Sequence, residues 1–459
     1  MERAWENLFF KKGFPTFLSL HRKEKAVSPR RLAFDVLKKM SAGGQYSNIA
    51  IDKALASAEL SEADRGLFTV IVMGVLERKI TLDYVIDRLA ADSNKIENDV
   101  RILLRMGLYQ LMFLDRVPEY AAINETVGLA PRRVRGFVNA MLRAYLRKKG
   151  CIEYPDKDKN AAEYISVKYS FPIELTERFI SIFGEDRTCN IFDFYNQTPP
   201  MTLRVNTLKT SRKDYAAELD RAGIKYELTE NSPNGIKVYG ASFSRLPKSD
   251  EGYFFVQDEA SQICVEALGA RSGNFVIDCC SCPGSKSFGA AISMENTGKI
   301  LSCDLHESKL SLVESGAKRL GIDIITTRAT DARKYDGTLC MSADALLCDA
   351  PCSGFGVMAK KPEIRYKDLT ESDKLPKIQS DILENVCKYV KVGGALVYST
   401  CTVFPEENTA VVKSFLNAHP EFVAEDFNVG NLSSECGMLS LFPDIHKTDG
   451  FFIAKMRRI

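Results

Sequence analysis

Two cysteines with the chemistry of nucleophiles follow apolar segments late in the chain. Cys352 comes directly after Pro351 in LLCDAPCSG (346–354), and Cys401 follows Thr400 in YSTCTVFPEEN (398–408). Each apolar segment predicts a buried strand, and the carboxyl ends of parallel strands form the edge of an α/β sheet where reacting groups collect. Two thiols at such an edge indicate sulfur chemistry.

An earlier segment, NFVIDCCSCPGSKS (274–287), predicts a turn that holds a cofactor. Its apolar run ends in an acid, and Pro283 and Gly284 then lead into a helix-compatible stretch. In a doubly wound sheet, a strand, a tight turn and a helix start form the cofactor site. The turn matches neither GxGxxG nor GxxxxGK[ST]. Lys286 precedes a hydroxyl residue, as the lysine of a phosphate-binding loop does. Only one glycine stands before it, however, so the loop is poorly suited to surround a triphosphate with backbone N–H groups.

Further acids follow the later strands of this predicted sheet. Asp304 lies about 20 residues beyond the first turn, where a carboxylate binds ribose hydroxyls. Asp331 could accept from an adenine amino group, and Asp349 follows the fourth strand. Any one of these acids could simply cap a helix, but acids at the ends of four strands are a narrower pattern. NAD remains possible on this evidence, although strand-end cysteines add little to hydride transfer.

The bulk composition describes a globular protein of two or three domains. The chain has 459 residues, 45% hydrophobic and 27% charged, and a net charge of +2 that excludes a general polyanion binder. Without an uninterrupted apolar window of about 18 residues, we expect no membrane span. The start of the chain lacks a cleavage site for secretion, and we interpret residues 1–26 as an extension.

Cysteine usage indicates a reducing, cytoplasmic location. Eleven of the thirteen cysteines lie from Cys264 onward, several within apparent strands, where buried thiols behave as small hydrophobes. Cys279, Cys280 and Cys282 do not have CxxC spacing, and the four histidines are scattered. We therefore expect no zinc or other metal site.

Helical periodicity runs through the first domain, residues 27–150, and strand signals are absent from it. Ser61 and Asp64 suit a helix start, and Pro118 and Pro131 mark later ones. The stretch 131–150 is basic and contains no acid; its cations are Arg132, Arg133, Arg135, Arg143, Arg147, Lys148 and Lys149. This helix either faces phosphates or is a solvated surface.

A polar linker, 151–160, precedes two further domains. Residues 160–262 mix short helices and strands and predict a small α+β module. Its aromatics 253–255 are either a stacking surface or core. Residues 263–459 alternate six apolar strands with helices, which predicts a doubly wound parallel sheet. The last strand follows the turn-rich PDIHKTDG, so we expect a hairpin and an antiparallel edge strand.

These segments resemble known families in order and in motif. The first domain is similar to the helical RNA-binding domain of the NusB antitermination factor, on PRRLAFDVL, AIDKAL, DRGLFTVIVMGVLE, ILLRMGLYQL, INETVGLA and FVNAMLR. TPPMTLRVNTLK and FFVQDEASQICVEAL resemble the segment that precedes the catalytic domain in RNA cytosine-5 methyltransferases. From residue 29 to the end, the chain looks most like the bacterial Sun/Fmu type, which carries a NusB-like domain and modifies 16S rRNA. The motifs that carry this likeness are VIDCCSCPGSKS, LSCDLHESKL, TDAR, LLCDAPCSGFG, KPEIRY, STCTVFPEEN and DGFFIAK.

The resemblance implies a fold, a cofactor and a set of site residues. The fold is multidomain: an all-α NusB-like bundle, a small α+β module and an α/β Rossmann-like class I methyltransferase domain. The methyl donor is S-adenosylmethionine, and the product is 5-methylcytosine in RNA. By analogy, the cofactor contacts are Cys280, Ser281, Cys282, Pro283, Gly284, Ser285, Lys286, Asp304, Asp331 and Asp349.

The resemblance also implies the mechanism. In the family, the Thr–Cys cysteine adds to C6 of cytosine and the Pro–Cys cysteine assists release, which makes Cys401 the nucleophile and Cys352 the release residue. Asp349 would bind the base at N3 or at the exocyclic amine, and Lys286 would lower the pKa of the thiolate or contact the base. DNA methyltransferases use the Pro–Cys cysteine as nucleophile, so the presence of both cysteines favours RNA, with the target base taken out of any stack.

One position departs from the family pattern, which reads PGGKT where this chain reads PGSKS. We expect Ser285 either to lower the affinity for the cofactor or to require a positive φ that serine disfavours. Three alternatives stay open: a transfer RNA substrate, a non-catalytic RNA-binding assembly factor and a thiol redox enzyme. We expect a monomer whose partner is RNA, not DNA or a membrane.

Overall fold

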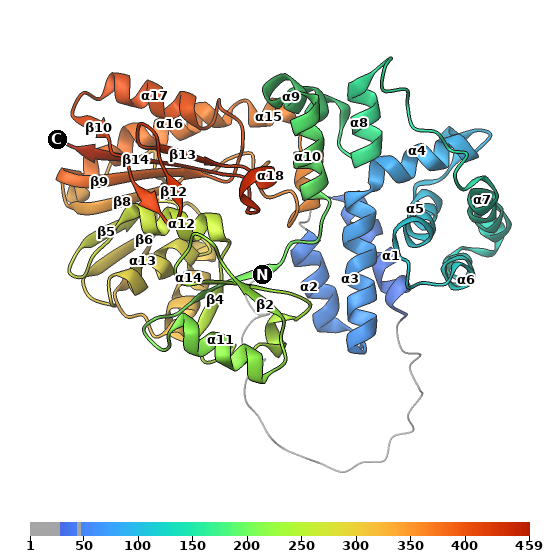
Figure 1. Ribbon diagram of the computed structural model, residues 1–459, viewed down its shortest axis with the longest axis horizontal. Helices are drawn as coiled ribbons and strands as arrows, with labels where there is room; N and C mark the ends of the chain where they lie inside the picture. Colours follow the sequence, from blue (N-terminus) through green and yellow to red (C-terminus); the bar gives the residue numbers. More distant parts are fainter. Residues whose placement is uncertain (1–27, 44–46) are drawn as a thin grey trace, which may run out of the picture.

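The computed structural model describes residues 28–43 and 47–459 in three regions (Figure 1). A helical region comes first, a small sheet second and a large mixed sheet last, in agreement with the predicted fold class. The predicted extension 1–26 lies outside the described residues. Among the residues described, none of the helices has the length and apolar character needed to cross a membrane.

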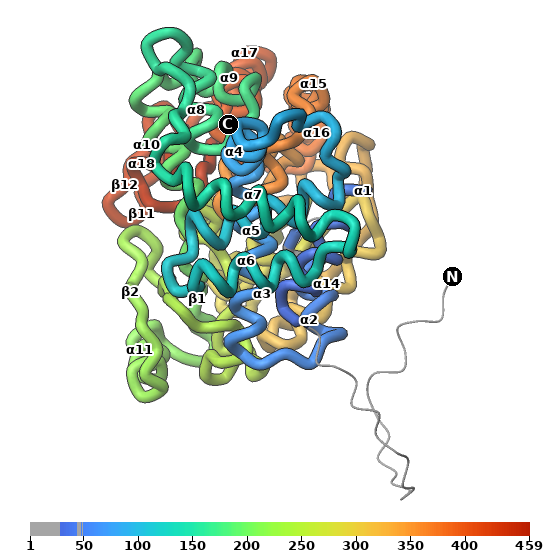
Figure 2. Tube along the Cα trace, turned by 90° about the vertical axis from the view of Figure 1, so that its right-hand side faces the viewer, coloured from blue at the N-terminus to red at the C-terminus, as the bar shows by residue number. Residues whose placement is uncertain are grey.

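The helical region is a bundle around one central helix, and its described part contains no strand. The central helix, α5, is buried at every position from Ile102 to Leu111, as expected for a helix that is apolar on most sides. Ser61 caps α3 by accepting from the backbone N–H of Asp64, which confirms that predicted helix start. The helices are α1 (Pro29–Ala42), α2 (Ser47–Ser57), α3 (Glu62–Glu77), α4 (Lys79–Leu89), α5 (Asn98–Phe113), α6 (Glu119–Leu129) and α7 (Arg135–Lys148). Seen from the helical side, α5, α6 and α7 cross the molecule one above another (Figure 2).

The middle region contains a helical part and a sheet part. Its helices are α8 (Ala161–Tyr169), α9 (Ile173–Phe183), α10 (Glu185–Tyr195) and α11 (Arg212–Arg221), and its strands are β1 (Met201–Val205), β2 (Tyr226–Leu228), β3 (Gly235–Val238) and β4 (Phe254–Val256). The strands form an antiparallel sheet in the order β2-β3-β1-β4. Phe254 and Phe255 are buried, so these two aromatics are core and not a stacking surface. Helices α8–α10 share their apolar cluster with Phe355 and Phe404 of the last region.

The last region is a doubly wound sheet in the order β10-β14-β9-β8-β5-β6-β7, with β5 to β9 parallel. Side chains alternate between its faces: Val276 packs toward α12–α14 and Ile277 toward α16 and α17. The strands are β5 (Phe275–Asp278), β6 (Lys299–Asp304), β7 (Ile325–Ala329), β8 (Ala343–Asp349), β9 (Val390–Thr400), β10 (Phe422–Ala424), β11 (Asn428–Val429), β12 (Leu432–Ser433), β13 (Met438–Leu441) and β14 (Phe451–Arg458). The helices are α12 (Glu259–Leu268), α13 (Ser285–Ser293), α14 (Glu307–Leu320), α15 (Leu369–Ser372), α16 (Leu375–Val386), α17 (Thr409–Ala418) and α18 (Pro443–His446).

The position of the last strand corrects one prediction. Strand β14 is antiparallel, as expected, but it is not an edge strand. It lies between β9 and the short β10, and β13 also pairs with it. The expected hairpin joins β13 to β14, with α18 inside the connection.

A buried arginine joins the helical region to the loop that follows β8. Arg365, in the short helix η5 (Pro362–Tyr366), donates to the carbonyl oxygen of Glu77 at 2.9 Å and to the Asn196 side chain at 3.1 Å. Tyr366 donates to the carbonyl of Leu76 at 2.7 Å. These contacts hold the carboxyl end of α3 against the last region.

Candidate active site

Neighbouring parallel strands bring the two predicted cysteines together. Strands β8 and β9 pair with Asp349 opposite Ser399, so the segments that leave both strands start at the same edge. The Sγ atoms of Cys352 and Cys401 lie 3.2 Å apart. The backbone N–H of Cys401 also donates to Cys352 Sγ at 3.3 Å.

The contact between the sulfurs makes the two thiols unequal. The hydrogen bond from Cys352 lowers the pKa of Cys401; burial and the Asp349 carboxylate oppose this shift, and the charge of Lys286 adds to it. The same contact with Cys401, together with burial, raises the pKa of Cys352 well above its usual value. By comparison, burial raises the pKa of Cys264 and of Cys282 to about 12. Of these two thiols, Cys401 thus loses its proton more readily, with Cys352 as its thiol donor.

Lys286 and Asp349 form an ion pair beside this thiolate. Lys286 Nζ lies 2.6 Å from Asp349 Oδ2, and the Ser399 hydroxyl donates to Asp349 Oδ1 at 2.7 Å. Burial lowers the pKa of Lys286, but the Asp349 carboxylate outweighs burial and raises it above the usual value. Lys286 also sits 5.2 Å from the centre of the Phe451 ring. The structure therefore brings together all four residues predicted for catalysis.

A cavity of about 630 Å³ opens onto these groups. Lys286, Asp349 and Cys401 line it, together with Asp258, Lys360, Asp449 and Phe451. One wall comes from the helical region, through Thr69, Val70, Met73, Gly74 and Glu77 of α3. No function was assigned to α3, Asp258, Lys360 or Asp449 from the sequence, although the last three stand in or beside quoted motifs.

The turn after β5 has the donors and acceptors that a polar cofactor needs. Ser281 Oγ and Asp278 Oδ1 are buried and find no hydrogen-bond partner within the part of the chain that the structure describes. Ser287 donates to the other oxygen of Asp278 at 2.6 Å, and burial raises the pKa of Asp278 to about 7. Two polar atoms without partners at one turn, Ser281 Oγ and Asp278 Oδ1, fit a bound cofactor with amino or hydroxyl groups.

The expected strain at Ser285 is wrong. The residue with the left-handed conformation is Gly284, with φ 105°, and Ser285 begins α13. Its carbonyl accepts from the Gln257 side chain at 3.0 Å. A serine is compatible with this position because the glycine before it provides the turn.

The remaining predicted acids lie at or just after the ends of their strands but have local partners. Asp304 is the last residue of β6 and accepts from the backbone N–H of His306 at 2.9 Å. Asp331 follows β7 and pairs with Arg333 at 2.9 Å; this hydrogen bond lowers the pKa of Asp331. Both acids lie at the carboxyl edge of the sheet, where a cofactor could exchange with these contacts. In the described residues, no group of histidines, cysteines and acids is arranged to hold a metal ion.

Three family models match successive parts of the chain. The NusB family matches residues 27–147, the ferredoxin-like domain of RsmF/B-like methyltransferases matches 171–242, and the 16S rRNA methyltransferase RsmB/F family matches 265–457. A "probable ribosomal RNA small subunit methyltransferase B" from Bacillus subtilis is 34% identical, over 95% of this chain and 99% of that protein. The chain belongs to the RsmB/F family of 16S rRNA methyltransferases. Ribosomal RNA small subunit methyltransferase B of Escherichia coli O7:K1 is 33% identical, over 87% of this chain and 91% of its own.

A solved structure has the same fold along most of the chain. The crystal structure of PH0851 covers 95% of this chain and 100% of its own, with 28% identity and a TM-score of 0.77. Family membership confirms the predicted NusB-like domain, the methyltransferase activity and S-adenosylmethionine as the methyl donor.

Proposed function

We propose that this methyltransferase modifies C5 of a cytosine in 16S rRNA through a covalent bond between Cys401 and C6. The observation that carries the proposal is the pair of sulfurs 3.2 Å apart, of which Cys401 has the lowered pKa. Cytosine C5 is a poor nucleophile, and addition of a thiolate to C6 makes it reactive. A thiolate held next to a thiol suits a sulfur that must first attack and later leave.

The other residues around the thiolate have matching roles in this proposal. Lys286 favours the thiolate through its charge. Asp349, held by Lys286 and Ser399, accepts a hydrogen bond from the exocyclic amine of the base. The thiol of Cys352 donates to the sulfur of Cys401 as it leaves.

The cofactor-binding residues are proposed on the same edge of the sheet. S-Adenosylmethionine, when bound, supplies the methyl group. Ser281 and Asp278 have free polar atoms for it, and the turn from Cys280 to Lys286 encloses it. Asp304 and Asp331 would bind the ribose hydroxyls and the adenine amino group after giving up local contacts.

The RNA is proposed to reach the cavity as a single strand. A cavity of about 630 Å³ is large enough for one extruded base with its sugar. On the helical region, the basic stretch at α7 has exposed cations for the backbone. Arg133 in this stretch is paired with Glu97, whereas Arg132, Arg147 and Lys148 have no ion pair with any described residue.

The experiment combines nucleoside mass spectrometry with two variants. Incubation with S-adenosylmethionine and unmodified 16S transcript should give 5-methylcytidine, with transfer RNA as the parallel substrate. Cys401→Ala should abolish methyl transfer, and Cys352→Ala should accumulate a covalent protein–RNA adduct on a denaturing gel. An adduct that persists in Cys401→Ala would contradict the assignment of the nucleophile, and product in transfer RNA alone would contradict the substrate.

A further inference from the structure

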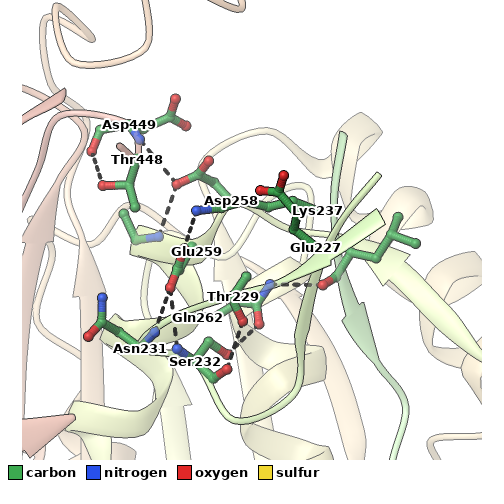
Figure 3. Close-up of polar contacts among 12 residues, drawn as sticks. Glu227, Thr229, Asn231, Ser232, Lys237, Asp258, Glu259, Gln262, Thr448 and Asp449 are labelled. Carbon is green, nitrogen blue, oxygen red and sulfur yellow. Dashed lines mark hydrogen bonds and ion pairs between the residues drawn. The ribbon is translucent and has the colours of Figure 1, made fainter. Parts of the chain in front are cut away.

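A half-buried lysine joins two acids in the wall of the cavity that contains Cys401. Lys360 Nζ contacts Asp258 Oδ2 and lies 2.8 Å from Asp449 Oδ2. The backbone N–H of Asp449 also donates to Asp258 at 3.4 Å, and Figure 3 shows these two residues side by side. The three residues come from the start of α12, the loop after β8 and the loop before β14, and all three line the cavity.

The pairing of β14 with β9 explains why this cluster lies near the reacting sulfur. The strands are antiparallel, with Phe452 opposite Thr400. The carboxyl end of β9 and the amino end of β14 therefore meet at one edge of the sheet. Cys401 leaves from one strand at this edge, and Asp449 enters the other.

The small sheet of the middle region fixes the position of Asp258. Asp258 caps α12 by accepting from the backbone N–H of Ala260 at 2.9 Å. The next residue, Glu259, accepts from the backbone N–H of Asn231 at 2.8 Å and pairs with Lys237 at 2.7 Å (Figure 3). Asp258 and Lys360 are consequently rigid supports for the Asp449 carboxylate.

Asp449 is the member of the cluster that can take up a proton. Burial raises its pKa to about 7, the nearby charge of Asp258 acts in the same direction, and Lys360 opposes both. Burial also acts to raise the pKa of Asp258, but there Lys360 outweighs it and the pKa is lowered. Of the two carboxylates, Asp449 is thus the stronger base.

Asp349 and Cys352, the other groups described beside Cys401, already have hydrogen-bond partners and roles in the proposed function. Both oxygens of Asp349 hold hydrogen bonds, from Lys286 and from Ser399. Cys352 is favoured as a protonated thiol that faces Cys401. A methylated adduct, however, must lose its C5 proton before the sulfur can leave.

We propose that the Asp449 carboxylate removes the C5 proton of the methylated base, a role that rests on the proposed function. The C5–H bond breaks and the proton moves to an Asp449 oxygen. The C5–H electron pair forms the C5=C6 double bond, and the C6–S bond breaks. Its electrons return to Cys401 as a thiolate, which accepts a hydrogen bond from the Cys352 thiol.

The test separates proton removal from the earlier steps. RNA that carries tritium at cytosine C5 reports proton removal as tritium released to water, and Asp449→Asn should slow this release by about 10²-fold or more. The variant should accumulate a methylated adduct that denaturing gels resolve. Asp449→Glu should recover part of the release, since it restores a carboxylate. Asp444→Asn, in α18 and outside this cavity, is the matched control and should release tritium at the normal rate.

A second substrate tests whether Asp449 is merely structural. With 5-fluorocytosine RNA and the methyl donor, the adduct cannot lose fluorine as a cation, so trapping needs no base. Asp449→Asn should trap this RNA within about twofold of the rate of the unaltered enzyme. Trapping that slows as much as tritium release, or tritium release at the normal rate, would overturn the role of Asp449.

A further variant distinguishes failure of this inference from failure of the proposed function. Cys352→Ala should accumulate an adduct on ordinary RNA whether or not Asp449 is the base. If Cys352→Ala and the fluorinated RNA both give adducts while Asp449→Asn releases tritium normally, the inference about Asp449 alone is wrong. If neither gives an adduct, the covalent mechanism itself is wrong.

Discussion

Substitution of Gly284 by alanine should destabilise the turn that precedes Lys286. Gly284 has φ 105°, and a left-handed conformation costs a residue with a Cβ about 1–2 kcal/mol. An added Cβ would also lie 2.7 Å from the Phe288 ring. That ring packs edge-on against Phe255. It also lies close to the backbone of Gly316, where a Cβ, if there were one, would stand 2.4 Å from the ring. The ring therefore has little room to shift.

The two effects set the expected size of the change. Overpacking a close-packed site costs about 1–3 kcal/mol, so the sum for Gly284→Ala is about 2–5 kcal/mol. In a domain of this size, each kcal/mol lowers the melting temperature by about 2–4 °C. Thermal unfolding of the full chain, followed by circular dichroism, should therefore show a decrease of at least about 4 °C.

Ser285→Gly is the matched control at the next position. Ser285 is the first residue of α13, where glycine should cost less than about 1 kcal/mol. Calorimetric titration with S-adenosylmethionine should give unchanged affinity for Ser285→Gly and weaker binding for Gly284→Ala. An equal loss of stability in both variants, or a gain in affinity for Ser285→Gly, would refute our interpretation of the turn.

Two further predictions concern stability away from the turn. Burial lowers the pKa of His419, but hydrogen bonds to Glu384 and Glu421 outweigh burial and raise it above the usual 6.5; the stabilisation is therefore complete below this value and is lost as pH rises through the folded pKa. Urea unfolding across this range should show the loss, and His419→Gln should remove the pH dependence that His419 contributes. Arg365→Met should lower the free energy of unfolding by about 3 kcal/mol, because it leaves buried acceptors from three helical segments without a donor. Removal of the unpaired Arg365 nitrogens offsets part of this loss, and an unchanged urea midpoint would contradict the prediction.

The positions that sequence predicts for these site residues depend on strand ends. Cys352, Cys401 and Asp349 each follow an apolar run, and the parallel order of the strands then forces them to one edge. The position of Lys286 is predicted in the same way, from the turn that follows the end of β5. In all four cases, a local pattern and one topological rule determine the position.

The cluster around Lys360 could not be predicted this way. Asp258 and Asp449 are 191 residues apart, and they meet only because β14 pairs with β9 inside the sheet. The apolar pattern of β14 predicts a strand. It does not predict that β14 pairs with β9 along one side and with the short β10 and β13 along the other. A partner so brief leaves little periodic signal in the sequence.

The α3 wall of the cavity depends on tertiary packing in the same way. In the sequence, the residues of α3 are typical of one face of an ordinary helix, because Val70 and Met73 follow helical spacing. They line the cavity only because Arg365 and Tyr366 hold the end of α3 against the loop after β8. This docking depends on a few polar contacts, and helical periodicity in the sequence does not reveal which residues make them.

The Lys286–Asp349 pair and the cluster of Lys360 with Asp258 and Asp449 together explain how this site can stabilise one negative charge. Lys286 and Asp349 neutralise each other, so the Cys401 thiolate is the net charge on one side. When Cys401 is bound to C6 as a thioether, this charge is absent, and an ionised Asp449 beside Lys360 carries the negative charge that the release step uses. Proton transfer from C5 to Asp449 then neutralises the carboxylate while the thiolate re-forms. Because the release step moves the negative charge from Asp449 to Cys401 within one cavity, no charge has to enter or leave the protein interior in that step, and its desolvation cost stays low.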